Sequence, residues 1–133
     1  MRWNPYLTFN GQCEAAFRFY ERCLGGKITF RMTYGDSPMA GQTPAEWHEK
    51  ILHATFEREG QVLAGVDVMP VSYQTPQGFS VSLNLADAAE AERIFTALAE
   101  GGMVQMPLEE TFWAKRFGLV TDRFGTPWMI NCA

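Results

Sequence analysis

Histidine is the residue type in this chain best suited to proton transfer near neutral pH, and the chain has two. His48 and His53 stand five residues apart around Lys50, in what we predict to be a loop and the start of an apolar strand. They therefore do not form the helical pair of an HxxxH zinc motif. A neutral imidazole on a strand can act as an acid, a base or a ligand. His53 is our first candidate catalytic residue, and the alternative is a half-buried histidine bonded to the backbone.

Two acids beside two aromatic residues form the second candidate, in the segment Glu109-Glu110-Thr111-Phe112-Trp113. Burial against an indole ring raises the pKa of a carboxyl group toward the range useful for general acid or base catalysis. We therefore predict Glu110 as a catalytic residue. The alternative is a solvent-exposed carboxylate at a strand end, paired with Lys115 or Arg116, and such surface pairs signify little.

Aromatic side chains supply the candidate binding surface. Tyr6, Trp113 and Trp128 can stack on a flat or apolar small molecule, and together with Asp67 they make up the predicted ligand-binding set. Most large aromatic residues belong to a core instead. Tyr6 lies at the opposite strand parity to its apolar neighbours, and Trp113 lies beside acids, which favours these two as ligand contacts.

The composition narrows the classes of partner. Eleven Lys and Arg against fifteen Asp and Glu give a net charge of −4, and the basic residues are scattered, so we expect no binding to nucleic acid. No run approaches the roughly 20 apolar residues of a membrane span, and the N-terminal residues lack the apolar centre of a signal peptide, so we expect a cytoplasmic protein without a membrane partner.

Cys13, Cys23 and Cys132 show no CxxC spacing and are expected to be buried, reduced thiols.

Hydrophobic periodicity predicts the elements that must position these residues. A period of two predicts a strand over 3–9, and apolar residues at steps of three and four predict a helix over 12–24 that ends at Gly25-Gly26. A second strand is predicted over 27–34, followed by irregular structure to Lys50 with one short helical turn at Pro44-Ala45-Glu46. Two further strands, 51–56 and 61–68, flank the hairpin turn Glu57–Gly60. The order is β-α-β-β-β.

The same order recurs in the second half of the chain. A shift of 76 residues places Leu7 on Leu83, Phe19 on Phe95 and Gly25-Gly26 on Gly101-Gly102. A shift of 65 places Arg58 on Arg123 and Gly60 on Gly125, so the hairpins 51–68 and 117–132 correspond. We predict a single α+β domain with module one at 1–69, a connector at 70–77 and module two at 78–133. One module leaves a sheet face that its helix does not cover, so modules from one chain or two are expected to pair, with curved mixed sheets around a cleft. We also expect a homodimer.

Three strings of residues carry a family resemblance. They are Asn4-Pro5-Tyr6-Leu7-Thr8-Phe9, Phe19-Tyr20-x-x-x-Leu24-Gly25-Gly26, and Glu110-Thr111-Phe112-Trp113-Ala114-x-x-Phe117-Gly118-x-x-Thr121-Asp122-x-Phe124-Gly125-x-x-Trp128-Met129-Ile130-Asn131. With these the chain resembles the PhnB-like branch of the vicinal oxygen chelate superfamily, the glyoxalase and bleomycin-resistance proteins. The resemblance implies the doubled β-α-β-β-β fold. It does not select a function, because this fold carries isomerases, dioxygenases, transferases and non-catalytic drug binders.

Metal-dependent members of this superfamily carry one His, Gln or Glu on the first and last strand of each module. The matching positions here fall near Pro5, Ala64, Ser80 and Met129, none of which is a strong ligand for a divalent cation. We therefore predict no metal tetrad and no cofactor. The acids Asp67, Glu109, Glu110 and Asp122 leave room for a weakly bound Mg²⁺ or Mn²⁺, although Asp122 with Gly125 three places on is typical of a β-turn.

Two functions follow as hypotheses. The first is a protein that binds a small, partly apolar molecule in a cleft without the usual metal tetrad. The alternative is a lyase, isomerase or oxygenase that uses His53 and Glu110 for proton transfer. Some relatives carry a methyltransferase label, but Gly25-Gly26 ends a helix, whereas a phosphate-binding glycine loop precedes one, so we do not expect a nucleotide-like cofactor.

Overall fold

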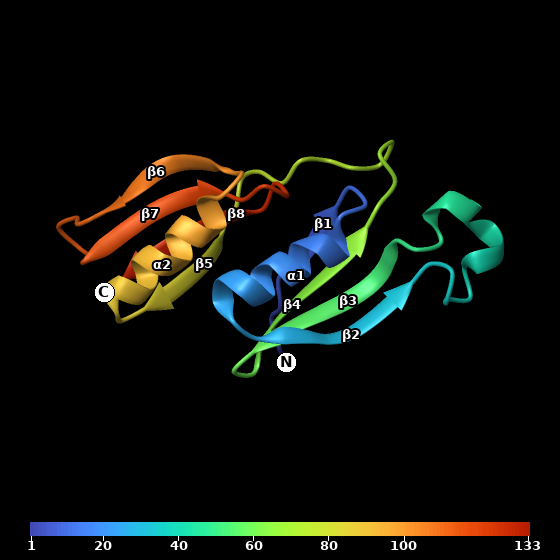
Figure 1. The fold of residues 1–133 in the computed structure, drawn as a ribbon, viewed down its shortest axis with the longest axis horizontal. Coiled ribbons are helices and arrows are strands. Elements are labelled where there is room, and N and C mark those ends of the chain that lie inside the picture. The colour runs from blue at the N-terminus through green and yellow to red at the C-terminus, as the bar shows by residue number, and fades with distance from the viewer. The chain divides into compact units, whose positions relative to one another are not determined.

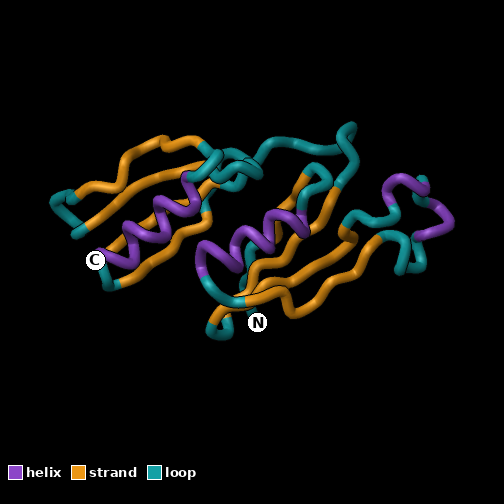
Figure 2. Tube along the Cα trace, in the orientation of Figure 1, coloured by secondary structure: helices purple, strands orange, loops and turns teal.

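The first half of the chain folds as one helix on a four-stranded sheet (Figure 1). The computed structural model describes residues 1–133 and divides them into two units, unit one at Met1–Gln74 and unit two at Thr75–Ala133. The elements of unit one are β1 (Tyr6–Phe9), α1 (Cys13–Leu24), β2 (Lys27–Thr33), β3 (Ile51–Arg58) and β4 (Gln61–Asp67). Two short 3₁₀ turns, η1 (Ala40–Gln42) and η2 (Ala45–Trp47), lie in the long loop between β2 and β3 (Figure 2).

The strand order in unit one is β1-β4-β3-β2, with β1 parallel to β4 and the other two pairs antiparallel. Alternate residues of each strand point to opposite faces, so Leu7 and Phe9 are buried on the face that α1 covers. Phe17 and Tyr20 of the helix pack on Phe56 of β3, with ring centroids 6.0 and 6.4 Å away. The other side of the sheet carries the remaining alternate residues. We call the side of a sheet that its helix does not cover the helix-free face, in unit one and in unit two.

Unit two repeats this arrangement. Its elements are β5 (Val81–Leu85), α2 (Ala88–Ala99), β6 (Met103–Glu109), β7 (Arg116–Thr121) and β8 (Pro127–Cys132), and its strand order is β5-β8-β7-β6. The core beneath α2 is formed by Leu98 of the helix with Val120, Trp128 and Ile130 of the sheet, all nearly inaccessible. The predicted α+β fold of two β-α-β-β-β modules is therefore confirmed, while the cleft and the homodimer stay predictions.

The repeat extends to the register of the strands. In unit one the β2–β3 ladder slips between Ile28 and Phe30, and in unit two the β6–β7 ladder slips between Val104 and Met106, which are the same positions shifted by 76. Such a slip is a β-bulge, a feature that twists an edge strand and re-aims its side chains. The shift between β4 and β8 is 65, as predicted. Between β3 and β7 it is 64, because the second hairpin turn is one residue longer.

The first strand is shorter than predicted. It begins at Tyr6, which pairs with Ala64, and Trp3 lies outside it with 88% of its surface exposed. Pro5 has no N–H to donate, and its carbonyl oxygen accepts a hydrogen bond from the Ala64 N–H at 3.0 Å. The ladder therefore starts after the proline.

Other predicted elements agree closely with the structure. Helix α1 runs from Cys13 to Leu24, and η2 follows Pro44 where one helical turn was expected. All three cysteines are buried as free thiols. None of the helices has the length and apolar character needed to cross a bilayer.

Candidate functional site

Three aromatic rings meet on the helix-free face of unit one. We call Tyr6 of β1, Phe30 of β2 and His53 of β3 the aromatic cluster. The His53 ring lies 5.7 Å from Tyr6 and 5.9 Å from Phe30, measured between centroids, with interplanar angles of 37° and 52°. Tyr6 is 55% exposed and Phe30 is 44% exposed. Large apolar surface of this kind, gathered around a polar group, is typical of a binding site.

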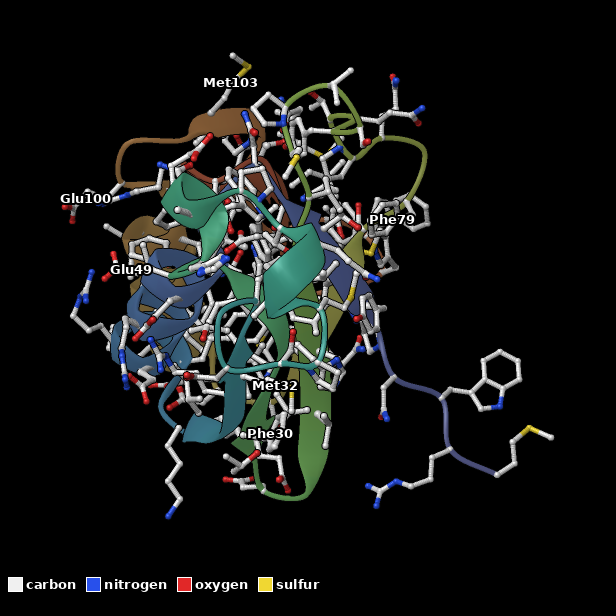
Figure 3. All side chains as sticks on the ribbon, turned by 90° about the vertical axis from the view of Figure 1, so that its right-hand side faces the viewer. Phe30, Met32, Glu49, Phe79, Glu100 and Met103 are labelled. Atoms are coloured by element: carbon white, nitrogen blue, oxygen red, sulfur yellow. The ribbon has the colours of Figure 1, made fainter.

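The sheet brings these rings together by parity and register. His53 and Thr55 alternate with the buried Ala54 and Phe56, so they point away from α1. The bulge in β2 lets Phe30 pair with Thr55, while Met32 pairs with His53. Phe30 and Met32 lie near one another along β2 (Figure 3).

The polar atoms of the cluster are the Tyr6 hydroxyl and the two ring nitrogens of His53. The hydroxyl oxygen lies 3.2 Å from Nδ1 of His53. No protein group bonds Nε2, and this nitrogen is not among the buried unpartnered atoms, so solvent or a ligand can reach it. Partial burial raises the pKa of Tyr6, with a smaller contribution from Cys13, so the phenol keeps its proton at neutral pH.

Unit two offers a direct comparison. The same register positions there hold Ser82 in place of Tyr6, Met106 in place of Phe30 and Phe117 in place of His53. These positions remain partly apolar but carry no titratable group. The phenol and imidazole pair is therefore particular to unit one, although the fold provides the position twice.

Asp67, a predicted ligand contact, is engaged with the backbone. Its two carboxylate oxygens accept hydrogen bonds from the N–H groups of Cys13 and Ile51, each at 2.8 Å, and the side chain is 1% exposed. It ties the end of β4 to the start of α1 and the start of β3. It also lines a pocket of about 940 Å³ beside the loop between β2 and β3, but its oxygens are already occupied. The contacts indicate a structural role.

Trp128 and Asp122 form a buried pair in unit two. The indole Nε1 of Trp128 donates to Oδ2 of Asp122 at 2.8 Å, and Oδ1 accepts from the N–H groups of Phe124 and Thr126. Trp128 is 1% exposed on the side of the sheet that α2 covers. The helix-free face therefore does not include Trp128, and Asp122 organises a turn, as its spacing from Gly125 indicated.

Glu110 and Trp113 lie in the loop between β6 and β7. Glu110 is exposed, so the burial against an indole that its predicted role requires is not present. Trp113 is 53% exposed, and its ring contacts Phe112 and Phe117 edge to face at 4.7 and 5.3 Å. Trp113 and Glu110 belong to unit two, whereas Tyr6 and His53 belong to unit one.

The register also refines the positions expected for a metal tetrad. Ala64 and Met129 lie on helix-free faces, and their cross-strand neighbours on the first strands are Tyr6 and Ser82 instead of Pro5 and Ser80. The first-strand neighbours of Ala64 and Met129 therefore lie one residue beyond Pro5 and two residues beyond Ser80. No group of three or more His, Cys, Asp or Glu side chains is placed to hold a metal ion.

The structure gives His48 and Phe30 roles that the sequence did not indicate. Nε2 of His48 lies 3.0 Å from the Ala40 carbonyl oxygen and 2.9 Å from that of Thr43, so His48 holds the loop between β2 and β3. Phe30 was missed as a site residue. Its strand alternates in an ordinary way in the sequence, and only the bulge, which the sequence does not signal, turns it onto the face with His53.

Comparisons with known proteins agree with the fold. A family model described as 3-demethylubiquinone-9 3-methyltransferase matches residues 2–131. Protein YjdN of Escherichia coli is 37% identical over 139 aligned positions, which cover 98% of this chain and 95% of YjdN. The crystal structure of protein PA1353 from Pseudomonas aeruginosa has a TM-score of 0.90 and 49% identity, over 99% of this chain and 97% of that one.

More distant structures share the fold alone. A PhnB protein from Bacillus cereus matches with a TM-score of 0.83 at 24% identity over the whole of both chains. A glyoxalase-related enzyme from Fulvimarina pelagi matches with a TM-score of 0.62 at 21% identity over 100% of this chain and 89% of that chain. With the doubled β-α-β-β-β fold and the match over residues 2–131, the chain belongs to the 3-demethylubiquinone-9 3-methyltransferase family, the PhnB-like branch of the glyoxalase-fold proteins.

Proposed function

We propose that the protein binds a small, partly apolar molecule on the helix-free face of unit one, at the aromatic cluster. The observation that carries this proposal is the meeting of three rings, two of them substantially exposed, around an imidazole nitrogen that has no protein partner. Exposed rings supply stacking surface, and one polar group among them supplies orientation.

The neighbouring residues suit a ligand with a flat apolar body. Ala64 and Met32 are the cross-strand neighbours of Tyr6 and His53, and both are uncharged. The hydroxyls of Thr29 and Thr55 bond one another at 2.8 Å beside the cluster. A molecule placed at the aromatic cluster therefore has rings, methyl groups and hydroxyls as its nearest neighbours from these strands.

Proton transfer is the second candidate function, and the hydrogen bond between Tyr6 and His53 favours it. An imidazole held by a second group through Nδ1 presents Nε2 to a reacting atom, which is the usual arrangement for general acid or base catalysis. Glu110 is exposed and lies in unit two, so the proton-transfer proposal rests on His53 alone. Any turnover found should fall at least about tenfold in His53→Ala without loss of the fold, and undiminished turnover in this variant would reject the role.

Methyl transfer, named in the family description, is not part of the proposal. Gly25-Gly26 and Gly101-Gly102 both follow helices, whereas a phosphate-binding glycine loop precedes one. We also propose that binding needs no metal tetrad. Metal analysis of the purified protein should find far less than one ion per chain, and a stoichiometric ion would contradict this.

The binding proposal is tested by a fragment screen with backbone amide NMR. Aromatic fragments should shift amide signals of β1, β2 and β3 around Tyr6, Phe30 and His53, and should raise the unfolding temperature. Phe30→Ala should weaken binding by roughly tenfold, the scale of one lost aromatic contact. Met39→Ala is the matched control, because Met39 is equally exposed at 44% but lies in the loop before η1. Shifts confined to other regions, or equal losses in both variants, would reject the proposed site.

A further inference from the structure

The hydrogen bond between Tyr6 and His53 can have either residue as its donor. Which of them donates decides whether Nε2 of His53 offers a ligand a hydrogen-bond donor or an acceptor. Nδ1 of His53 and the Tyr6 hydroxyl oxygen share one proton across 3.2 Å. If the phenol donates, the neutral imidazole carries its own proton on Nε2 and presents a donor. If the imidazole donates from Nδ1, it presents a bare acceptor instead.

Three arguments favour the phenol as the donor. A phenol O–H is a good donor and an imidazole nitrogen a good acceptor, whereas the phenol oxygen is a poor acceptor because its lone pair is delocalised into the ring. The raised pKa of Tyr6 keeps the hydroxyl proton in place through neutral pH. The hydroxyl has no other protein partner to which it could donate.

We propose that Tyr6 is a positioning residue that holds the neutral ring of His53 in the tautomer with its proton on Nε2. The aromatic cluster then selects flat apolar molecules that carry a hydrogen-bond acceptor oxygen, such as an aryl ketone or an aryl carboxylate. This inference rests on the proposed function and names the ligand class for the same face. The cross-strand neighbours Met32 and Ala64 supply no competing donor, so Nε2–H is the donor that the aromatic cluster itself presents to a ligand.

The tautomer is measured in the free protein, without any ligand. With only two histidines in the chain, ¹⁵N spectra of the imidazole nitrogens are simple, and His53→Gln assigns the signals. The neutral ring of His53 should show a protonated Nε2 and an unprotonated Nδ1. Tyr6→Phe should move the His53 signals toward the tautomer mixture of free histidine. Protonation at Nδ1 in the unsubstituted protein would overturn the inference.

Matched variants separate positioning from general disturbance of the strand. Thr8 lies two residues along β1 on the same face and makes no side-chain hydrogen bond. Thr8→Val also removes a hydroxyl group but should leave the His53 signals unchanged. An equal change in Thr8→Val and Tyr6→Phe would show that the effect does not come from the bond to Nδ1, and would overturn the role of Tyr6.

Ligand selectivity is measured with probes of similar size. Acetophenone and benzoate carry an acceptor oxygen on an aromatic ring, whereas benzylamine carries only donors. The first two should bind roughly tenfold more tightly, the scale of one hydrogen bond, and Tyr6→Phe should reduce the preference several-fold. Equal binding of all three at the cluster would overturn the ligand class while leaving the proposed function intact. If none of the three shifts signals of this face, the proposed function fails, and the tautomer result stands or falls separately.

Discussion

At the scale of single residues, burial decides what each acidic side chain of this protein does. Asp67 and Asp122 are the two most buried acids, and the carboxylate oxygens of both accept hydrogen bonds from backbone or indole N–H groups. Glu110, the acid beside aromatic residues in the sequence, is exposed. Local sequence shows which acids have aromatic neighbours, but burial is set by strands that are distant along the chain, so it could not be read in advance.

Asp122 gives a stability prediction. Asp122→Ala removes the carboxylate that accepts from the N–H groups of Phe124 and Thr126 and from the indole of Trp128, so the free energy of unfolding should fall by about 3 kcal/mol. Urea denaturation measures this. Asp87→Ala removes an exposed helix cap that accepts from the Ala89 N–H, and should cost only about 1 kcal/mol. Comparable losses in the two variants would contradict the structural role of Asp122.

Asp67 gives a prediction on pH. Burial raises the pKa of Asp67 above its ordinary value of 3.8, and the N–H groups of Ile51 and Cys13, the charge of Lys50 and the N–H group of Gly11 offset part of the rise. Because the folded state then holds the proton more tightly than the unfolded state, this contribution to stability is present at low pH and is lost as pH rises through the raised pKa.

The matching experiment compares unfolding free energies of the unsubstituted protein and Asp67→Asn from about pH 3.5 upward. Asparagine does not titrate, so the difference between the two proteins isolates Asp67. The unsubstituted protein should lose stability relative to the variant as pH rises. A relative gain would mean that the amide hydrogen bonds outweigh burial.

At the scale of elements, the second glycine of each diglycine is needed because of close packing. A Cβ on Gly26 would lie 2.4 Å from the Glu57 carbonyl oxygen, and one on Gly102 would lie 2.3 Å from that of Thr121. Both contacts are to backbone, which cannot move aside easily. The recurrence of Gly-Gly after each helix was visible in the sequence, and the reason for it is the turn of the helix onto the neighbouring hairpin.

Gly102→Ala should therefore lower the free energy of unfolding by about 2 kcal/mol or more, since overpacking against backbone strains the sheet. Gly41→Ala is the control. A Cβ there meets nothing within 4 Å, and the change should stay within about 0.5 kcal/mol. Thermal and urea unfolding of both variants measure the difference, and a harmless Gly102→Ala would show that the close approach is wrong.

Element order could be predicted because the signals are local. Helix periodicity, the diglycines and the Glu59-Gly60 turn, where both residues have positive φ, appear directly in the sequence. The aromatic cluster could be predicted only in part. Parity indicated Tyr6, but the bulge that brings Phe30 to His53 and the late start of β1 after Pro5 depend on pairing with distant strands.

At the scale of the whole molecule, the same fold is used twice with different surface chemistry. The shared register places Tyr6, Phe30 and His53 in unit one where Ser82, Met106 and Phe117 stand in unit two. Membership of the family accounts for the duplicated scaffold and not for this difference, because a fold carries many functions. The chemistry of the site is set by the residues at these positions.

The rate at which the cysteines react with a thiol reagent shows whether both units stay folded. Cys13 and Cys23 are buried in unit one and Cys132 in unit two, and burial raises the pKa of the Cys13 thiol, with smaller contributions from Asp67 and Glu14. A thiolate-selective reagent should therefore label no cysteine of the native protein quickly, and three after denaturation. Rapid labelling of one thiol in the native protein would show that its unit opens locally.

The most direct test of the binding site is a crystal structure of the protein soaked with the tightest-binding aromatic fragment from the screen. We predict that the fragment lies on the helix-free face of unit one, stacked against Tyr6 or Phe30, with its polar atom within hydrogen-bond distance of Nε2 of His53. A fragment bound elsewhere, with the aromatic cluster left empty, would contradict it.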